Sequence, residues 1–142
     1  MDPRDFNRLA DVLSHGTSSS EARSAISRAY YAVYHVAVET LKNVGISISI
    51  GPAGHGEVLR YLANSGDAEV CRMASDLSDF RRKRNDADYD LSNSAVEKAT
   101  VAQSYVHLAE RIISALDACQ VEPRRSHIMA DLAAYRNKLK PN

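Results

Sequence analysis

Apolar residues recur at steps of three and four positions along most of the chain, which is the spacing of one face of an α-helix. The clearest case is segment 18–45, where Ser18 and Glu21 have the spacing of an N-terminal capping box and Gly45 marks the end. The apolar stripe of this segment comprises Ile26, Tyr30, Val33, Tyr34, Ala37, Leu41 and Val44. Further alanines and valines widen the stripe almost around the cylinder, so we expect this helix to be central.

The same spacing predicts helices before and after this segment. A first helix begins at Asp2-Pro3 and ends before Gly16, and the stretch "ISISIGPAGHG" is interpreted as a loop because no second strand is available to pair with it. A capping box is also predicted at Ser94 and Glu97, with an apolar stripe running from Ala95 to Leu116. The remaining predicted helices cover about 55–63, a longer stretch from Asp67 and, after Pro123, about 124–139.

This arrangement predicts an all-α fold in one domain. With strand signals nearly absent, the expected architecture is an antiparallel four- to five-helix up-and-down bundle. Its core covers about residues 8–118, and a C-terminal helical extension covers about residues 124–139.

Composition narrows the class of protein. The 142 residues carry a formal net charge of zero, which argues against coating nucleic acid through bulk charge but leaves room for a local basic patch. Cys71 and Cys119 lack CxxC spacing and the histidines do not cluster, so we expect no metal site, no disulfide framework and no cofactor. No apolar run approaches the roughly 20 residues of a transmembrane helix, and no signal peptide is evident, so a cytoplasmic protein is expected.

Residues 79–92, "DFRRKRNDADYDLS", interrupt the helical pattern with charge. On a helical wheel Arg84 falls on the apolar face that Leu77 and Phe80 define, whereas Arg82 and Lys83 turn towards solvent and Arg81 sits on the shoulder. A guanidinium on an inward face needs a partner or an open cleft. Asp88, one turn later, would make an internal ion pair; alternatively, the face opens onto a groove or a second subunit where the arginine meets phosphate.

Three segments resemble the HEPN family (higher eukaryotes and prokaryotes nucleotide-binding). "SRAYYAVYHVAVETL" at 27–41 is similar to its tyrosine-rich helix, "RRKRNDADYDL" at 81–91 to its motif segment, and "GHGEVLRYL" at 54–62 to its short histidine-led helix. The resemblance implies an antiparallel bundle, often homodimeric, with the motif helices facing a shared cleft. In catalytic members an arginine and a histidine cleave RNA without a metal, while other members are non-catalytic partners of nucleotidyltransferases.

Carried over by position, Arg84 matches the motif arginine, Asn85 the polar residue after it, and Tyr89 stands where the nuclease pattern has histidine. A tyrosine, with a pKa of about 10, is a poor general base at neutral pH, and a neighbouring arginine should weaken Asp88 as a base. His55 is the candidate replacement. The catalytic candidates are therefore Arg84, Asp88, Tyr89 and His55, and the binding candidates are Arg81, Asn85, Tyr30 and Tyr34.

The other aromatic residues are expected to be structural. Tyr30 and Tyr34 should pack in the bundle with their hydroxyls on polar partners, with Arg84 and Asp88 as candidates, rather than stack on bases. His35 is interpreted as a hydrogen-bonded packing residue, and His15, His107 and His127 as helix-end or surface residues.

Three functions follow from these observations. The first is a non-catalytic, dimeric HEPN module that binds nucleic acid, a nucleotide or a protein partner through the Arg84 face. The second is a metal-independent endoribonuclease of the toxin type, neutralised by a nucleotidyltransferase-like protein. The third is a structural role in which the polar motif serves only as a dimer contact.

Overall fold

The computed structural model describes residues 1–140, and all regular structure in that range is helical. Six α-helices and one short 3₁₀ helix make up the fold, which confirms the all-α prediction. Their bounds are α1 Arg4–Ser14, α2 Ser19–Asn43, α3 Ala53–Ala63, α4 Ala68–Tyr89, η1 Ser94–Glu97, α5 Ala99–Ala118 and α6 Arg124–Leu139. No helix within residues 1–140 combines the length and the hydrophobicity that a membrane span requires.

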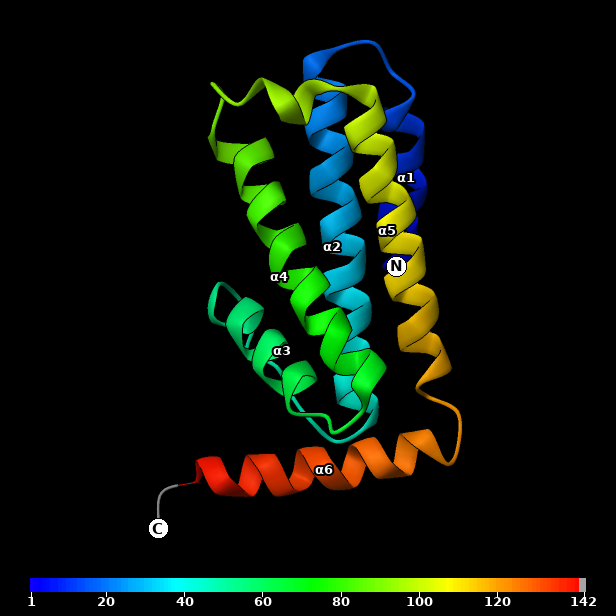
Figure 1. Cartoon of the computed structure of the whole chain (residues 1–142), viewed down its shortest axis with the longest axis vertical. Helices are drawn as coiled ribbons and strands as arrows, with labels where there is room; N and C mark the ends of the chain where they lie inside the picture. Colours follow the sequence, from blue (N-terminus) through cyan, green and yellow to red (C-terminus); the bar gives the residue numbers. More distant parts are fainter. Residues whose placement is uncertain (141–142) are drawn as a thin grey trace.

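Four helices form the body of the molecule. α1, α2, α4 and α5 run along its long axis with alternating direction, the short α3 packs beside α4, and α6 lies across one end (Figure 1). The antiparallel bundle with an additional C-terminal helix is therefore confirmed. α6 is held against that end by buried Ile128 and Leu132, and Arg124 donates hydrogen bonds to Asp67 at the start of α4.

Helix α2 is the centre of the bundle, as its wide apolar stripe predicts. It packs against α1, α3, α4 and α5, and every residue of the predicted stripe is buried. Its N-terminus has the predicted capping box: the Ser18 hydroxyl accepts from the Glu21 amide, and the Glu21 carboxylate accepts from the Ser18 amide. A central, capped α2 gives a rigid platform for the tyrosines that it carries.

The second predicted capping box, at Ser94 and Glu97, is wrong. Ser94–Glu97 forms the 3₁₀ helix η1, Asn93 caps it by accepting from the Ala95 amide, and α5 begins only at Ala99. The apolar face shifts accordingly, with Val96 buried and Ala95 exposed. The physical reason is that the Glu97 carboxylate accepts two hydrogen bonds from Arg23, at 2.9 and 3.0 Å, instead of turning back onto its own backbone.

Arg23 is a buried arginine that the sequence analysis did not single out. Its side chain is 9% exposed, and its nitrogens donate to the backbone carbonyls of Asp86, Ala87 and Asp90 at the end of α4 and of Asn93 beyond it. These carbonyls include ones that a helix terminus leaves without intrahelical partners. Arg23 therefore fastens the C-terminal end of α4 to the centre of the bundle. The one available signal was its position seven residues before Tyr30, on the same inward face.

Candidate functional site

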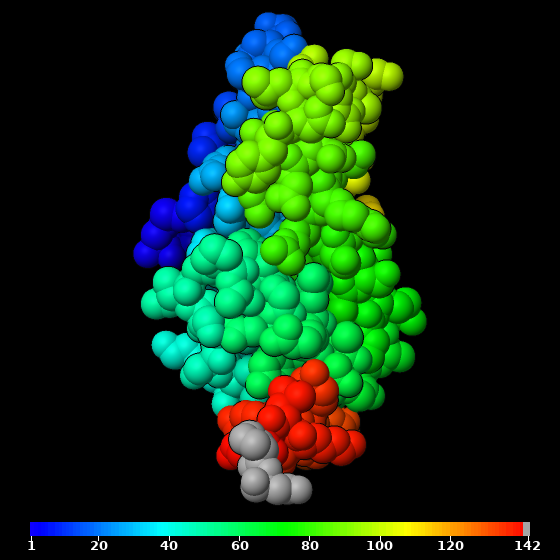
Figure 2. Space-filling model, turned by 90° about the vertical axis from the view of Figure 1, so that its left-hand side faces the viewer, coloured from blue at the N-terminus to red at the C-terminus, as the bar shows by residue number. Residues whose placement is uncertain are grey.

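A groove opens where the end of α4 faces α2 and the start of α3. It has a volume of about 410 Å³, and it is lined by Tyr31, Tyr34, His35, Gly51, Pro52, His55, Arg84 and Tyr89. Figure 2 looks onto this side of the molecule, where the teal surface of α3 and its preceding loop meets the green surface of α4, with the dark blue start of the chain beside them. We call this cavity the Arg84 groove.

Arg84 is the charged residue of the groove. Its side chain is 7% exposed, and its Nη1 forms an ion pair with Asp88 Oδ2 at 3.5 Å. Asp88 is more exposed, and it accepts a hydrogen bond from the Ser27 hydroxyl at 3.1 Å. The internal ion pair predicted from the sequence therefore exists, and Arg84 also lines an open cavity.

The Arg84 guanidinium lacks the partners that a buried arginine normally has. Within residues 1–140 it makes no hydrogen bond to a carbonyl or side chain, and its Nε is buried without a partner. What surrounds it is aromatic: its Cζ lies 5.2 Å from the Tyr30 ring centroid, 5.3 Å from that of Tyr31 and 5.8 Å from that of Tyr89. Ring faces attract a cation but accept no conventional hydrogen bond, so Arg84 keeps N–H donors that no protein acceptor in the described residues fills.

Tyr30 and His55 form a hydrogen-bonded pair beneath the groove. The Tyr30 hydroxyl lies 2.6 Å from His55 Nδ1, and burial raises the pKa of Tyr30 to about 12. Tyr30 is therefore a neutral phenol, and its hydroxyl and His55 Nδ1 share one hydrogen bond whose donor depends on the imidazole tautomer. Nε2 is the ring nitrogen that remains for a ligand. The predicted packing of Tyr30 is confirmed, with His55 as its polar partner.

The sequence before His55 lets this ring approach α2 closely. Gly54 is buried, and a Cβ atom at this position would lie 2.3 Å from the Tyr34 hydroxyl and 2.5 Å from the Ser49 carbonyl oxygen. Only glycine fits there without displacement. Tyr34 then stacks on His55 with ring centroids 4.3 Å apart, so aromatic contacts from α2 fix the imidazole on two sides.

The electrostatics of the groove are positive. Burial first, and then the charges of Arg81 and Arg84, lower the pKa of His55 from its ordinary value of 6.5. Arg81 is half-buried one turn before Arg84, and its Nε also lacks a partner. The carboxylates nearby are engaged elsewhere: Asp88 with Ser27 and Arg84, and Glu57 with Ser49. In a chain of zero net charge, this is a local excess of cations.

The pKa of His55 provides a direct test of this electrostatic arrangement. We expect His55 to titrate below 6.5 in a ¹³C-edited NMR titration of the histidine rings, and its pKa to rise in Arg81→Gln because one repelling cation is removed. An unchanged His55 midpoint in Arg81→Gln would contradict the assigned cause of the shift.

The remaining candidates lie at different depths around the groove. Asn85 and Asp88 are both exposed, and neither lines the cavity. Arg82 is exposed as predicted. His35 differs from its interpretation as a hydrogen-bonded packing residue: it is exposed, lines the groove and stacks on Phe6, without a hydrogen bond in the described part of the chain. The predicted surface histidines, at positions 15, 107 and 127, are exposed.

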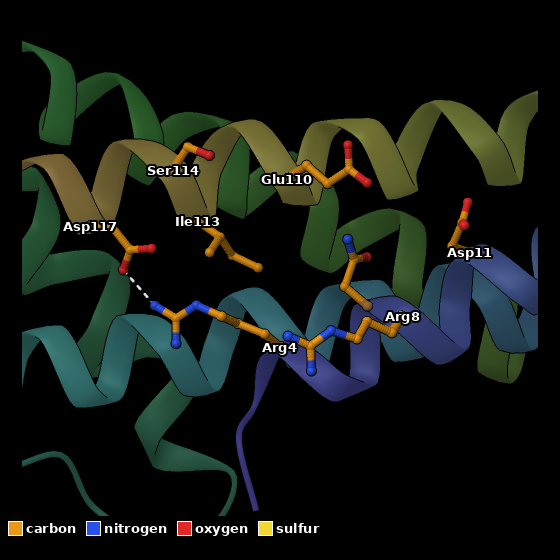
Figure 3. A pocket seen from close by; sticks show the side chains of 8 residues that line it. Arg4, Arg8, Asp11, Glu110, Ile113, Ser114 and Asp117 are labelled. Carbon is orange, nitrogen blue, oxygen red and sulfur yellow. Dashed lines mark hydrogen bonds and ion pairs between the residues drawn. The ribbon is translucent and has the colours of Figure 1, made fainter.

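A second cavity, of about 420 Å³, lies between α1 and α5 (Figure 3). Its charges are matched within the protein, because Arg4 forms ion pairs with Asp117 and Asp2, and Arg8 forms one with Asp5. Asp11 and Glu110 also line it, so it carries no excess of positive charge. This contrast favours the Arg84 groove as the functional site.

Comparison of the chain with protein-family models, with curated proteins and with solved structures found no match.

Proposed function

We propose that this protein is a HEPN-like helical module that binds single-stranded RNA in the Arg84 groove, with Arg84 on a phosphate. The observation that carries the proposal is a guanidinium, 7% exposed, that lines a cavity and makes one long ion pair instead of a full set of hydrogen bonds. Phosphate oxygens are the acceptors that match the planar fork of arginine. The similarity of segments 27–41, 54–62 and 81–91 to HEPN proteins supports a nucleic acid as the source of that phosphate.

The aromatic side chains support a nucleic acid rather than an inorganic anion. Tyr89 is 76% exposed at the edge of the groove, and Tyr31 and His55 line its wall. Exposed rings beside arginines are the combination on which single-stranded bases stack while the phosphates meet positive charge. His55 Nε2 remains for a polar group of the same ligand.

The chemistry of the groove favours binding over cleavage. Cleavage of RNA without a metal needs a group that removes the proton from the 2′-hydroxyl. Tyr89 offers a phenol, which is a weaker base than the imidazole of a histidine, Asp88 is paired with Arg84, and His55 is hydrogen-bonded through Nδ1 to Tyr30. The metal-independent endoribonuclease of the toxin type, controlled by a nucleotidyltransferase-like protein, is therefore the second candidate, with His55 as its base.

We further propose that the module acts as a homodimer, as the resemblance implies. The apolar side chains of Ile50, Tyr89 and Leu91 are exposed and lie at or within two residues of positions that line the groove. A second copy of the chain would cover them and deepen the groove. In this arrangement the two Arg84 grooves would share one ligand.

The proposal is tested with fluorescein-labelled single-stranded RNA. We expect fluorescence anisotropy to report binding that weakens with added salt, because phosphate contacts release counterions. The same RNA, incubated with the protein and EDTA and run on a denaturing gel, should remain intact. Cleavage that persists in EDTA and is lost in Arg84→Gln would show that the protein is the endoribonuclease rather than a binding module. The absence of both binding and cleavage would overturn the proposal.

A further inference from the structure

Arg28 is a second arginine without a carboxylate partner on the same side of the molecule. It lies on α2, is half-buried, and forms neither an ion pair nor a hydrogen bond within residues 1–140. Its Cζ lies 5.2 Å from the ring centroids of both Phe6 and Tyr31. Two rings therefore hold the guanidinium in place and leave its donors free, as they do for Arg84.

Tyr31 joins the two arginines. Arg84 lies 5.3 Å from the Tyr31 centroid and Arg28 5.2 Å from it, so the two guanidinium carbons cannot be further apart than about twice that distance. The two arginines lie on different helices, Arg28 on α2 and Arg84 on α4. In the described residues no carboxylate forms an ion pair with Arg28. Asp88 pairs with Arg84, so Arg28 is the cation that a ligand phosphate would neutralise.

An apolar hollow continues the Arg84 groove beyond Tyr31. It has a volume of about 310 Å³, and it is lined by Met1, Pro3, Phe6, His35, Val38 and Glu39. His35 lines both cavities, and its ring stacks on Phe6 with centroids 6.0 Å apart. His35 therefore lies between the two cavities, and Arg28, which lines neither, contacts one lining residue of each, Phe6 and Tyr31.

We infer that the ligand spans both cavities: Arg84 and Arg28 hold two successive phosphates of one strand, and a base enters the hollow against Phe6 and His35. The shared Tyr31 ring keeps Arg84 and Arg28 close enough for both to reach neighbouring phosphates of one strand. The Glu39 carboxylate at the hollow would accept from an exocyclic amine of that base. This inference rests on the proposed function and adds to it that the ligand is an oligonucleotide rather than a mononucleotide.

The test compares a ligand with one phosphate and a ligand with several. Labelled hexa-adenylate RNA is titrated by anisotropy at several salt concentrations, and adenosine monophosphate is measured as its competitor. For Arg28→Gln we expect weaker binding of hexa-adenylate and a slope of log affinity against log salt that is smaller by about 0.7, the value for one single-strand phosphate. Competition by adenosine monophosphate should be unchanged. Arg28→Lys should restore the slope, because it restores the charge.

Arg111→Gln is the matched control, since Arg111 is an exposed arginine on α5 without an ion pair in the described residues. It should bind both ligands as the unmodified protein does. If Arg28→Gln keeps the full salt slope while Arg84→Gln loses binding, the second phosphate site is wrong and the proposed function stands. Equal weakening of the monophosphate and the hexamer by Arg28→Gln would also overturn the two-site inference. If the unmodified protein binds no RNA, the proposed function itself fails.

Discussion

Replacing Arg84 by glutamine is expected to weaken single-stranded RNA binding by about 10- to 100-fold, the range for hydrogen bonds to a charged group. Arg84→Lys should give an intermediate loss, because it keeps the charge but not the planar fork. The matched control is Arg82→Gln, two residues earlier on α4, where the arginine is exposed and paired with Asp79. Its affinity for RNA should be unchanged. Anisotropy at fixed salt measures all three variants.

The stability of the same variants separates a binding role from a structural one. Arg84 makes no hydrogen bond in the described residues, and Asp88 keeps its bond to the Ser27 hydroxyl when the arginine is removed. Asp88 is itself exposed, so the loss of Arg84 leaves no buried charge without a partner. We therefore expect Arg84→Gln to leave the free energy of unfolding in urea unchanged within about 1 kcal/mol. A larger loss of stability together with unchanged RNA binding would show that the residue is structural.

Replacing Arg23 by glutamine should have the largest effect on stability. Arg23 donates to four backbone carbonyls and to Glu97, and its loss leaves the Glu97 carboxylate and the end of α4 without these partners. Breaking a buried charge pair by removing one partner costs about 3–5 kcal/mol. We expect a loss of that order in the free energy of unfolding, measured by urea denaturation and far-ultraviolet circular dichroism.

Two comparisons make this result interpretable. Arg111→Gln removes the same charge from an exposed position and should change stability by less than about 0.5 kcal/mol. Glu97→Gln keeps an acceptor oxygen for Arg23 and should cost less than Arg23→Gln. If Arg23→Gln falls within the range of the Arg111 control, the hydrogen bonds at the end of α4 do not hold the bundle together.

The two Ser-x-x-Glu segments illustrate what the sequence could and could not predict. Both have the same local pattern, yet Ser18 and Glu21 form a capping box, whereas Glu97 binds Arg23 from a helix 74 residues away in sequence. A local pattern predicts a capping box only where no charged residue distant in sequence binds the same side chain. The periodicity of α2, α4 and α6 has no such competitor, and their predicted positions agree with the structure.

The same distinction applies to the candidate site: features that depend on one helix could be predicted, and features that depend on contacts between helices could not. The inward position of Arg84 follows from helical geometry alone, because α4 continues without a break from Leu77 to Tyr89. The Tyr30–His55 hydrogen bond does not follow, since it depends on how closely α3 approaches α2 at Gly54. The free guanidinium of Arg28 was equally out of reach, because its neighbour Phe6 comes from α1.

The gathering of tyrosines around Arg84 gives the protein an optical reporter of its own. The chain has seven tyrosines and no tryptophan, so its near-ultraviolet absorbance and emission are dominated by tyrosine. Tyr31, Tyr34 and Tyr89 line the groove, and Tyr30 forms its floor beneath Arg84. Occupancy of the groove therefore changes the surroundings of more than half of the chromophores, whereas events at the α6 end involve Tyr61 and Tyr135. Unlabelled protein can report its own ligand.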